Sequence, residues 1–201
     1  VKVILAACGT ISSNAPDIIA ANETKTIGVL LPGAERLAAT GRKKLGVIAT
    51  KTSIESGAFQ LGVSRFAPDA KITAVACPDF VPMIESGHYL PDDPMVQDIV
   101  ARSLEPLKNV GALLLGCTHY GLIADAISAY LGKDVVLVGA ADASAETTAR
   151  YLRDCDMLAS GGGSESYYTS GSTADFEALA PIMLGYGLKS AVNHVEPFAL
   201  D

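Results

Sequence analysis

Short apolar runs alternate with segments of helical period along most of the chain. Six runs rich in aliphatic and β-branched residues are typical of buried strands: 3–7, 26–30, 45–49, 72–76, 112–115 and 135–138. The segments between them carry apolar residues at helical spacing and predict helices at 34–39, 54–65, 94–107, 122–131 and 143–154. Strands and helices that take turns in this way predict a mostly parallel sheet with helices on both faces. The predicted fold class is therefore α/β.

The helix expected at 94–107 shows the apolar spacing most clearly. The apolar residues on its one face are Val96, Ile99, Val100, Leu104 and Leu107. Pro94 suits its first turn, where a backbone N–H would have no helical partner. Gly132 follows the helix expected at 122–131, at a position where a left-handed residue commonly ends a helix.

The C-terminal part of the chain contains the glycine run 161–163, which we interpret as a loop. A phosphate-binding glycine motif needs a strand before it and a helix after it, and the pattern predicts neither next to this run. Further on, the pattern predicts a strand at 167–169, a helix at 174–184 and a last strand at 191–195.

Composition narrows the class of protein. Of the 201 residues, 49% are apolar and 18% are charged, so the chain can bury a core. The formal net charge of −7 repels phosphate backbones, so nucleic acid is not expected as a partner. No apolar run reaches membrane-spanning length and no signal peptide can be recognised, so no membrane partner is expected. The four cysteines have neither disulfide nor metal-site spacing, which indicates reduced thiols, no bound metal and a cytoplasmic protein.

Two cysteines directly follow predicted strands. Cys8 comes after the run 3–7, and Cys117 follows 112–115 with one glycine between. In an open parallel sheet, ligands bind outside the carboxyl ends of the strands, and helix N-termini there favour a thiolate. Two such thiols facing one cleft would provide a proton donor and a proton acceptor on opposite sides of one carbon atom. The alternative is that both are ordinary buried cysteines.

The turn after Cys117 is unusually polar. Thr118 and His119 follow four strongly apolar residues and a glycine, and a purely structural strand end has little need of both. His119 could bind a substrate carboxylate or orient a thiol. His88 and His194 stand alone in the sequence, and we expect both to be structural.

The other two cysteines fit structural roles better. Pro78 follows Cys77 and removes a backbone donor from that turn, so Cys77 is expected to be structural. Cys155 lies at the end of an amphipathic helix and is expected in the core.

Several segments resemble glutamate racemases. Residues 116–120, Gly-Cys-Thr-His-Tyr, are similar to the GCTHYP signature of that family. Residues 76–87 resemble its ACPxFVPxVEsG stretch, and residues 8–10 resemble its Cys-Asn-Thr turn. Residues 46–59, 168–171 and 193–195 also match family segments, in the same order along the chain.

The resemblance implies two similar three-layer α/β domains, with the active site in the cleft between them. The first would consist of residues 1–33 and 141–201, and the second of residues 34–140. The implied activity is racemisation of glutamate without pyridoxal phosphate, another cofactor or a metal, supplying D-glutamate for peptidoglycan. Glutamate is the expected partner molecule, and a second copy of the chain, in a homodimer, is the other partner considered.

The same matching assigns roles to particular residues. Cys8 would take the α-proton from the D-enantiomer while Cys117 supplies one from the other face, with the roles reversed for the L-enantiomer. Gly9, Thr10, Thr118 and His119 would contact the polar groups of the substrate, and His119 would also take part in catalysis. Glu85 is a further candidate catalytic residue near the second thiol or the substrate side chain. The alternative for Glu85 is a solvated carboxylate at a helix end.

The chain also departs from the family pattern. Gly9 replaces the usual asparagine and removes a side-chain amide that would contact the substrate. The family's Asp-Ser-Gly-x-Gly-Gly and Pro-Tyr-Gly turns have no counterpart, and the chain begins at Val1 on an apolar run. We therefore expect the natural protein to be longer at its N-terminus, and the strand at 3–7 to have an exposed apolar face or an unpaired edge beside it.

Three alternatives stay open at this point. The chain could be another member of the superfamily that acts on aspartate or hydantoins. It could also be a catalytically impaired fragment of this fold. A thiol hydrolase would need only one of the two thiols, together with a histidine and an oxyanion hole.

Overall fold

A four-stranded parallel sheet forms the centre of the chain in the computed structural model, which describes residues 1–197. Its strands are β3 (Lys44–Ala49), β4 (Lys71–Ala76), β5 (Ala112–Leu115) and β6 (Val136–Gly139), in the spatial order β4-β3-β5-β6. Because the strands are parallel, their carboxyl ends meet at one edge of the sheet. This edge carries the turns that hold Thr50, Cys77 and Cys117.

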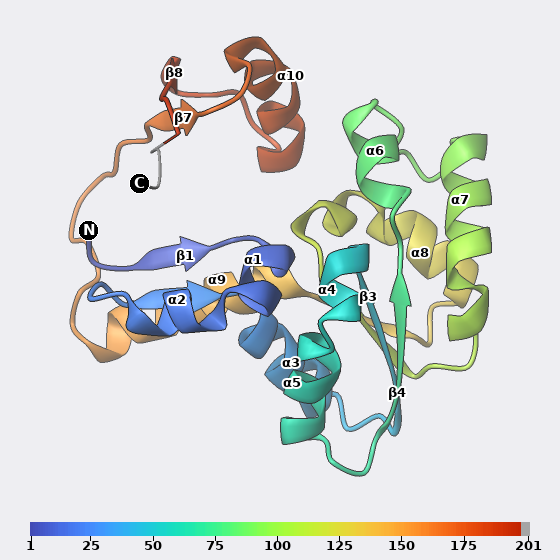
Figure 1. The fold of residues 1–201 in the computed structure, drawn as a ribbon. Helices are drawn as coiled ribbons and strands as arrows, with labels where there is room; N and C mark the ends of the chain where they lie inside the picture. The colour runs from blue at the N-terminus through green and yellow to red at the C-terminus, as the bar shows by residue number, and fades with distance from the viewer. Residues whose placement is uncertain (198–201) are drawn as a thin grey trace. The chain divides into compact units, whose positions relative to one another are not determined.

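Helices cover both faces of this sheet. Figure 1 shows α6 (Phe80–Glu85), α7 (Pro94–Leu104) and α8 (Ala124–Leu131) on one side of β3 and β4, with α3 (Leu30–Ala39) and α5 (Ala58–Phe66) on the other. Side chains alternate between the faces along each strand. On β5, Leu113 packs with the α6–α8 core and Leu114 packs with the α3–α5 core, and both are fully buried. The result is a three-layer α/β arrangement.

A second, smaller sheet lies in the same compact unit, residues 1–157. It pairs β1 (Ile4–Ala6) with β2 (Thr26–Gly28), and α1 (Gly9–Asn14) and α2 (Pro16–Ala21) connect the two strands. The long helix α9 (Ala140–Asp154) contacts both strands and also α3. Within residues 1–197, β1 pairs with β2 alone, so its other edge has no strand partner, as the sequence predicted.

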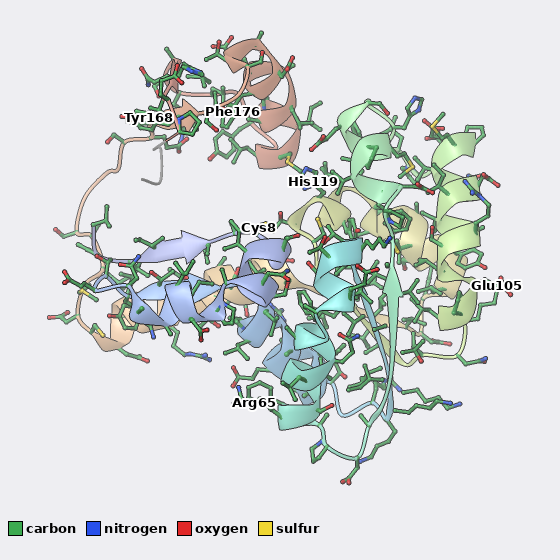
Figure 2. All side chains as sticks on the ribbon, viewed as in Figure 1. Cys8, Arg65, Glu105, His119, Tyr168 and Phe176 are labelled. Atoms are coloured by element: carbon green, nitrogen blue, oxygen red, sulfur yellow. The ribbon has the colours of Figure 1, made fainter. Side chains whose placement is uncertain are left out.

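Residues from Leu158 onward form another compact unit. It contains the parallel pair β7 (Tyr167–Thr169) and β8 (Val192–His194), connected by α10 (Thr173–Leu184). Ser172 caps α10, because its hydroxyl accepts a hydrogen bond from the Asp175 amide at 3.2 Å. In Figure 2, Tyr168 and Phe176 mark the strand and the helix of this unit.

The predicted α/β class and the parallel sheets are confirmed, and all predicted strands are present with small shifts at their ends. The apolar face of α7 is buried, Pro94 is its first residue, and Gly132 has the positive φ of +96° that only glycine adopts easily. The division into domains 1–33 with 141–201 and 34–140 stays a prediction.

Several local predictions were wrong or incomplete. The helix expected at 54–65 is two helices, α4 (Lys51–Glu55) and α5, because Gly57 with φ +70° breaks it. The short helices α1, α2 and α6 were not predicted. Cys155 is exposed rather than in the core, because the buried residues of α9 are confined to its first half, Ala140, Ala143 and Ser144. Across residues 1–197 we find no helix that has both the length and the apolar character needed to cross a membrane.

Candidate active site

Two cysteine turns face one cavity of about 330 Å³ within residues 1–157. Cys8 is the N-cap residue of α1, and Cys117 is the N-cap residue of η2 (Thr118–Ile123), a short 3-10 helix. Both residues have extended backbone angles, so each chain segment leaves its strand and turns directly into a helix. Figure 2 shows Cys8 at the start of α1. The volume is at the lower end of the range of small-molecule sites, about 300–1,000 Å³.

The cavity lining contains most of the predicted site residues. Those predicted from the sequence are Cys8, Gly9, Thr10, Cys117, Thr118 and His119, and the structure brings all six together. Thr118 also connects the two turns, because its hydroxyl donates to the Ala7 carbonyl at 3.4 Å. Glu85 is not part of the lining but reaches the cavity through His119.

His119 stands between a carboxylate and a thiol. Its Nε2 atom lies 3.0 Å from Glu85 Oε1, and its Nδ1 atom lies 3.8 Å from Cys117 Sγ. The carboxylate can only accept from a ring N–H, so the network assigns the proton to Nε2 and leaves Nδ1 as an acceptor for the Cys117 S–H. The Glu85 carboxylate and the Cys117 thiol are therefore connected through the His119 imidazole.

Burial raises the pKa of Cys117 above that of an ordinary thiol. The backbone N–H of His119 lowers the pKa of Cys117, but by less, and the neighbouring Cys8 and Glu85 both raise it. The expectation that a helix N-terminus makes this thiol more acidic is therefore wrong for Cys117, since desolvation outweighs the amide. At neutral pH Cys117 is a thiol, able to donate a proton.

Cys77 has the structural role predicted for it. It is 1% exposed, and burial raises the pKa of its thiol to about 12, with a smaller contribution from Asp79. The fully buried Tyr120 donates its hydroxyl proton to the Cys77 carbonyl at 2.9 Å, and its ring contacts Phe80 edge-on. These contacts hold η2 against the carboxyl end of β4.

Two hydroxyl residues of the lining, Thr50 and Ser53, were not predicted as part of the site, and they form a cluster with the predicted Thr10. Thr10 Oγ1 lies 3.0 Å from Thr50 Oγ1, which lies 2.9 Å from Ser53 Oγ, and Ser53 also reaches Thr10 at 3.3 Å. Thr50 caps α4 by accepting from the Ser53 amide. Thr50 directly follows β3, so the rule that identified the cysteine turns could have identified this residue too.

The lone histidines lie outside the cavity lining. His88 Nδ1 is 2.6 Å from Asp93 Oδ2, next to the cap of α7, and this contact lowers the pKa of Asp93. His194 contacts the Gly171 carbonyl at 3.1 Å and Glu196 at 3.3 Å. Within the described part of the chain, no group of three or more His, Cys, Asp or Glu side chains is arranged to hold a metal ion.

Comparison with known proteins finds relatives that are glutamate racemases. No protein-family model matches the chain. The glutamate racemase of Enterococcus faecalis is 34% identical over an alignment of 206 positions, which spans 97% of this chain and 74% of that protein.

Solved structures agree with the sequence comparison. The crystal structure of a glutamate racemase isoform from Bacillus anthracis matches with a TM-score of 0.88 and 31% identity, over 98% of this chain and 74% of that one. A glutamate racemase from Francisella tularensis, solved with D-glutamate, gives a TM-score of 0.86 and 28% identity over the same shares. This chain spans about three quarters of the length of these relatives.

Proposed function

The chain belongs to the glutamate racemase family, and we propose that it racemises glutamate with two thiols, those of Cys8 and Cys117. The observation that carries this proposal is that both thiols, from two separate strand-to-helix turns, line one cavity. Inversion at a carbon atom requires a base on one face and an acid on the other, and two opposed thiols can serve as both. We expect the two sulfur atoms to lie about 6 to 9 Å apart, since each proton transfer needs hydrogen-bond-like reach.

The direction from D- to L-glutamate starts with Cys8 as a thiolate. Cys8 Sγ takes the α-proton, and the electron pair stays on the α-carbon as a carbanion-like charge. Cys117 then donates its S–H proton to the opposite face, which leaves Cys8 as a thiol and Cys117 as a thiolate. The raised pKa of Cys117 supports its role as the acid in this direction.

The direction from L- to D-glutamate needs Cys117 as the base. His119 Nδ1 can accept the Cys117 thiol proton, because Glu85 stabilises the resulting imidazolium through Nε2. The Cys117 thiolate then takes the α-proton, and Cys8, in its thiol form, donates its S–H proton to the opposite face. In this proposal His119 takes the proton of a thiol whose ionisation burial disfavours, and Glu85 stabilises the charged imidazole ring.

The remaining lining residues suit the polar groups of an amino acid. Thr10, Thr118 and His119 offer donors and acceptors, and the backbone at Gly9 offers a contact where the family's asparagine has a side chain. Thr50 and Ser53 hold Thr10 in place through their hydroxyls. Donors placed at the substrate carboxylate would stabilise the charge as it develops.

The wider proposal follows the family. The reaction needs no pyridoxal phosphate or metal, since the thiols carry the proton and the surrounding donors carry the charge. The product D-glutamate would serve peptidoglycan synthesis in the cytoplasm. We keep the discontinuous domain arrangement and a homodimer as further parts of this proposal.

The test is racemisation in heavy water with the full chain. We expect deuterium at the α-carbon of both glutamate enantiomers, and a loss of about 100-fold or more in kcat/KM for Cys8→Ser and for Cys117→Ser. Cys155→Ser is the matched control, because this thiol is exposed and outside the lining. Near-normal racemisation by both active-site variants would reject the two-thiol mechanism. The same assay with aspartate distinguishes another racemase of this fold, and absence of activity on every amino acid indicates an impaired chain.

A further inference from the structure

The two cysteine turns approach each other most closely at Gly9. A Cβ atom at Gly9 would lie 2.2 Å from the Gly116 carbonyl oxygen and 3.3 Å from its carbon. Contacts of a Cβ below 3.0 Å essentially do not occur, and the atoms in question are backbone rather than a flexible side chain. A side chain at position 9 therefore requires one of the two turns to move.

Gly116 cannot easily move away. Its amide donates to the Ile48 carbonyl at 2.8 Å, which holds it against β3. A Cβ at Gly116 would itself lie 2.8 Å from the Ile48 oxygen and 3.1 Å from Phe59 Cζ. The same phenyl atom lies 3.6 Å from the Cβ position of Gly9, so Phe59 fills the space behind both glycines. Steric strain at position 9 would therefore displace the Cys8 turn.

We propose that Gly9 is a positioning residue that sets the separation of the two thiols, by letting the Cys8 and Cys117 turns touch backbone to backbone. Gly9 is bonded to Cys8, and Gly116 is bonded to Cys117, so the contact is one residue away from each sulfur-bearing residue. The inference rests on the proposed two-thiol reaction. An ordinary contact of 3.4 Å, compared with 2.2 Å, needs a shift of about 1 Å (3.4 − 2.2), and a misplacement of that size can cost about 100-fold in rate.

The proposal gives a reason for the departure from the family pattern. The resemblance places an asparagine at position 9, yet here the Gly116 carbonyl occupies the space that its Cβ would need. Restoring the family residue should therefore damage this enzyme instead of improving it.

The test compares Gly9→Ala and Gly9→Asn with Gly121→Ala. Gly121 is a matched control, because it lies in η2 near the same turns but has no atom within 4 Å of its Cβ position. We expect both Gly9 variants to lower kcat by about 100-fold with a much smaller change in KM, because the thiols are displaced. The control should stay within about twofold of the wild type.

A second readout measures the thiol separation without relying on activity. Bifunctional thiol reagents of graded length are applied in a Cys155→Ala background, and cross-linked Cys8–Cys117 peptides are quantified by mass spectrometry. In the wild type, Cys8 and Cys117 should be bridged best by reagents that span about 6 to 9 Å, which corresponds to two proton-transfer distances. In both Gly9 variants, the best reagents should be longer, because the Cys8 turn is displaced.

The outcomes separate the two proposals. A wild type without racemase activity rejects the proposed function, while the cross-linking pattern still decides the role of Gly9. An unchanged pattern in the Gly9 variants, or kcat within twofold for Gly9→Asn, overturns the positioning role. Inefficient bridging of the wild type at about 6 to 9 Å would instead contradict the thiol separation on which both proposals rest.

Discussion

The His119 imidazole lies 3.0 Å from the Glu85 carboxylate, although the two residues are 34 positions apart in the sequence. The histidine comes from η2 and the glutamate from the last position of α6. The carboxylate fixes the ring so that its other nitrogen faces Cys117. This arrangement places a base next to Cys117, a partly buried thiol whose raised pKa makes such a base necessary.

Replacing Glu85 by glutamine should therefore separate its effect on the His119 imidazolium from its effect on the pKa of Cys117. The neutral amide cannot stabilise an imidazolium, so we expect kcat/KM to fall by about tenfold or more. The factor must be equal for both enantiomers, because the equilibrium constant of racemisation is one. Glu85 also raises the pKa of Cys117 directly, because its charge repels the thiolate. Glu85→Gln removes this repulsion, so the ionisation of Cys117 beside a neutral His119 should move to lower pH, although proton transfer from Cys117 to His119 becomes less favourable.

The measurement is kcat/KM in both directions, together with the alkylation rate of Cys117 as a function of pH. Glu105→Gln is the control, because Glu105 (labelled in Figure 2) is an exposed carboxylate. It contacts Lys108 and Tyr130 and none of the cavity residues. Unequal factors would indicate an artefact of the assay. Unchanged kcat/KM and an unmoved Cys117 ionisation would show that Glu85 is only a solvated carboxylate.

The four thiols should react with an alkylating reagent in a defined order. Cys155 is exposed and should react first, whereas Cys77 is 1% exposed with a pKa of about 12. At pH 8 only about 1 in 10,000 Cys77 thiols is ionised, and the thiolate is the reactive form. Cys8 and Cys117 should react at intermediate rates and be protected by glutamate. Mass spectrometry of native and unfolded protein tests this order, and rapid native labelling of Cys77 would contradict the structure.

The strand-to-helix turns could be predicted because their signal is local. An apolar run followed by a small residue, a cysteine and polar residues placed both Cys8 and Cys117 at strand ends, and the structure has them there. The contact between Glu85 and His119 could not be predicted in this way, because it depends on how α6 and η2 pack. The helix α6 itself was missed, since six residues with Pro82 inside give little helical period.

Two other features depend on packing that sequence spacing does not describe. Cys155 was expected in the core from the period of α9, but the buried residues of that helix are all in its first half. The approach of Gly9 to Gly116 joins two turns more than a hundred positions apart. A glycine in place of asparagine looked like a lost substrate contact, whereas its surroundings show a steric requirement.

Replacing Tyr120 by phenylalanine should affect stability more than activity. The hydroxyl donates to the buried Cys77 carbonyl, which would keep only the longer hydrogen bond from the Phe80 amide at 3.4 Å, so we expect a loss of about 1 kcal/mol in the free energy of unfolding. The ring keeps its contact with Phe80, so we expect kcat/KM to stay within about twofold. Denaturant unfolding of Tyr120→Phe measures the loss. Tyr130→Phe is the control, because its hydroxyl bonds Glu105 at the surface and should matter less.

Replacing Thr50 by valine should affect both stability and substrate binding. Valine keeps the shape of the side chain but cannot accept from the Ser53 amide, which removes the cap of α4 and costs about 0.5 to 2 kcal/mol. It also removes the hydrogen bond that holds Thr10 at 3.0 Å. Since Thr10 is proposed to contact the substrate, KM should rise by more than kcat falls.

Thr50→Ser keeps the hydroxyl and is the matched control for Thr50→Val. It should restore most of the cap and the contact with Thr10, so its denaturation midpoint and its KM should lie near those of the wild type. If Thr50→Val lowers the denaturation midpoint but leaves KM unchanged, the hydroxyl cluster of Thr10, Thr50 and Ser53 stabilises the fold and has no role in substrate binding. Thr50→Ser keeps the hydroxyl and loses only the methyl group. If its KM rose as far above the wild type as that of Thr50→Val, the hydrogen bonds of Thr50 to Thr10 and Ser53 would not be enough to explain substrate binding, and the methyl group would be needed to orient the hydroxyl.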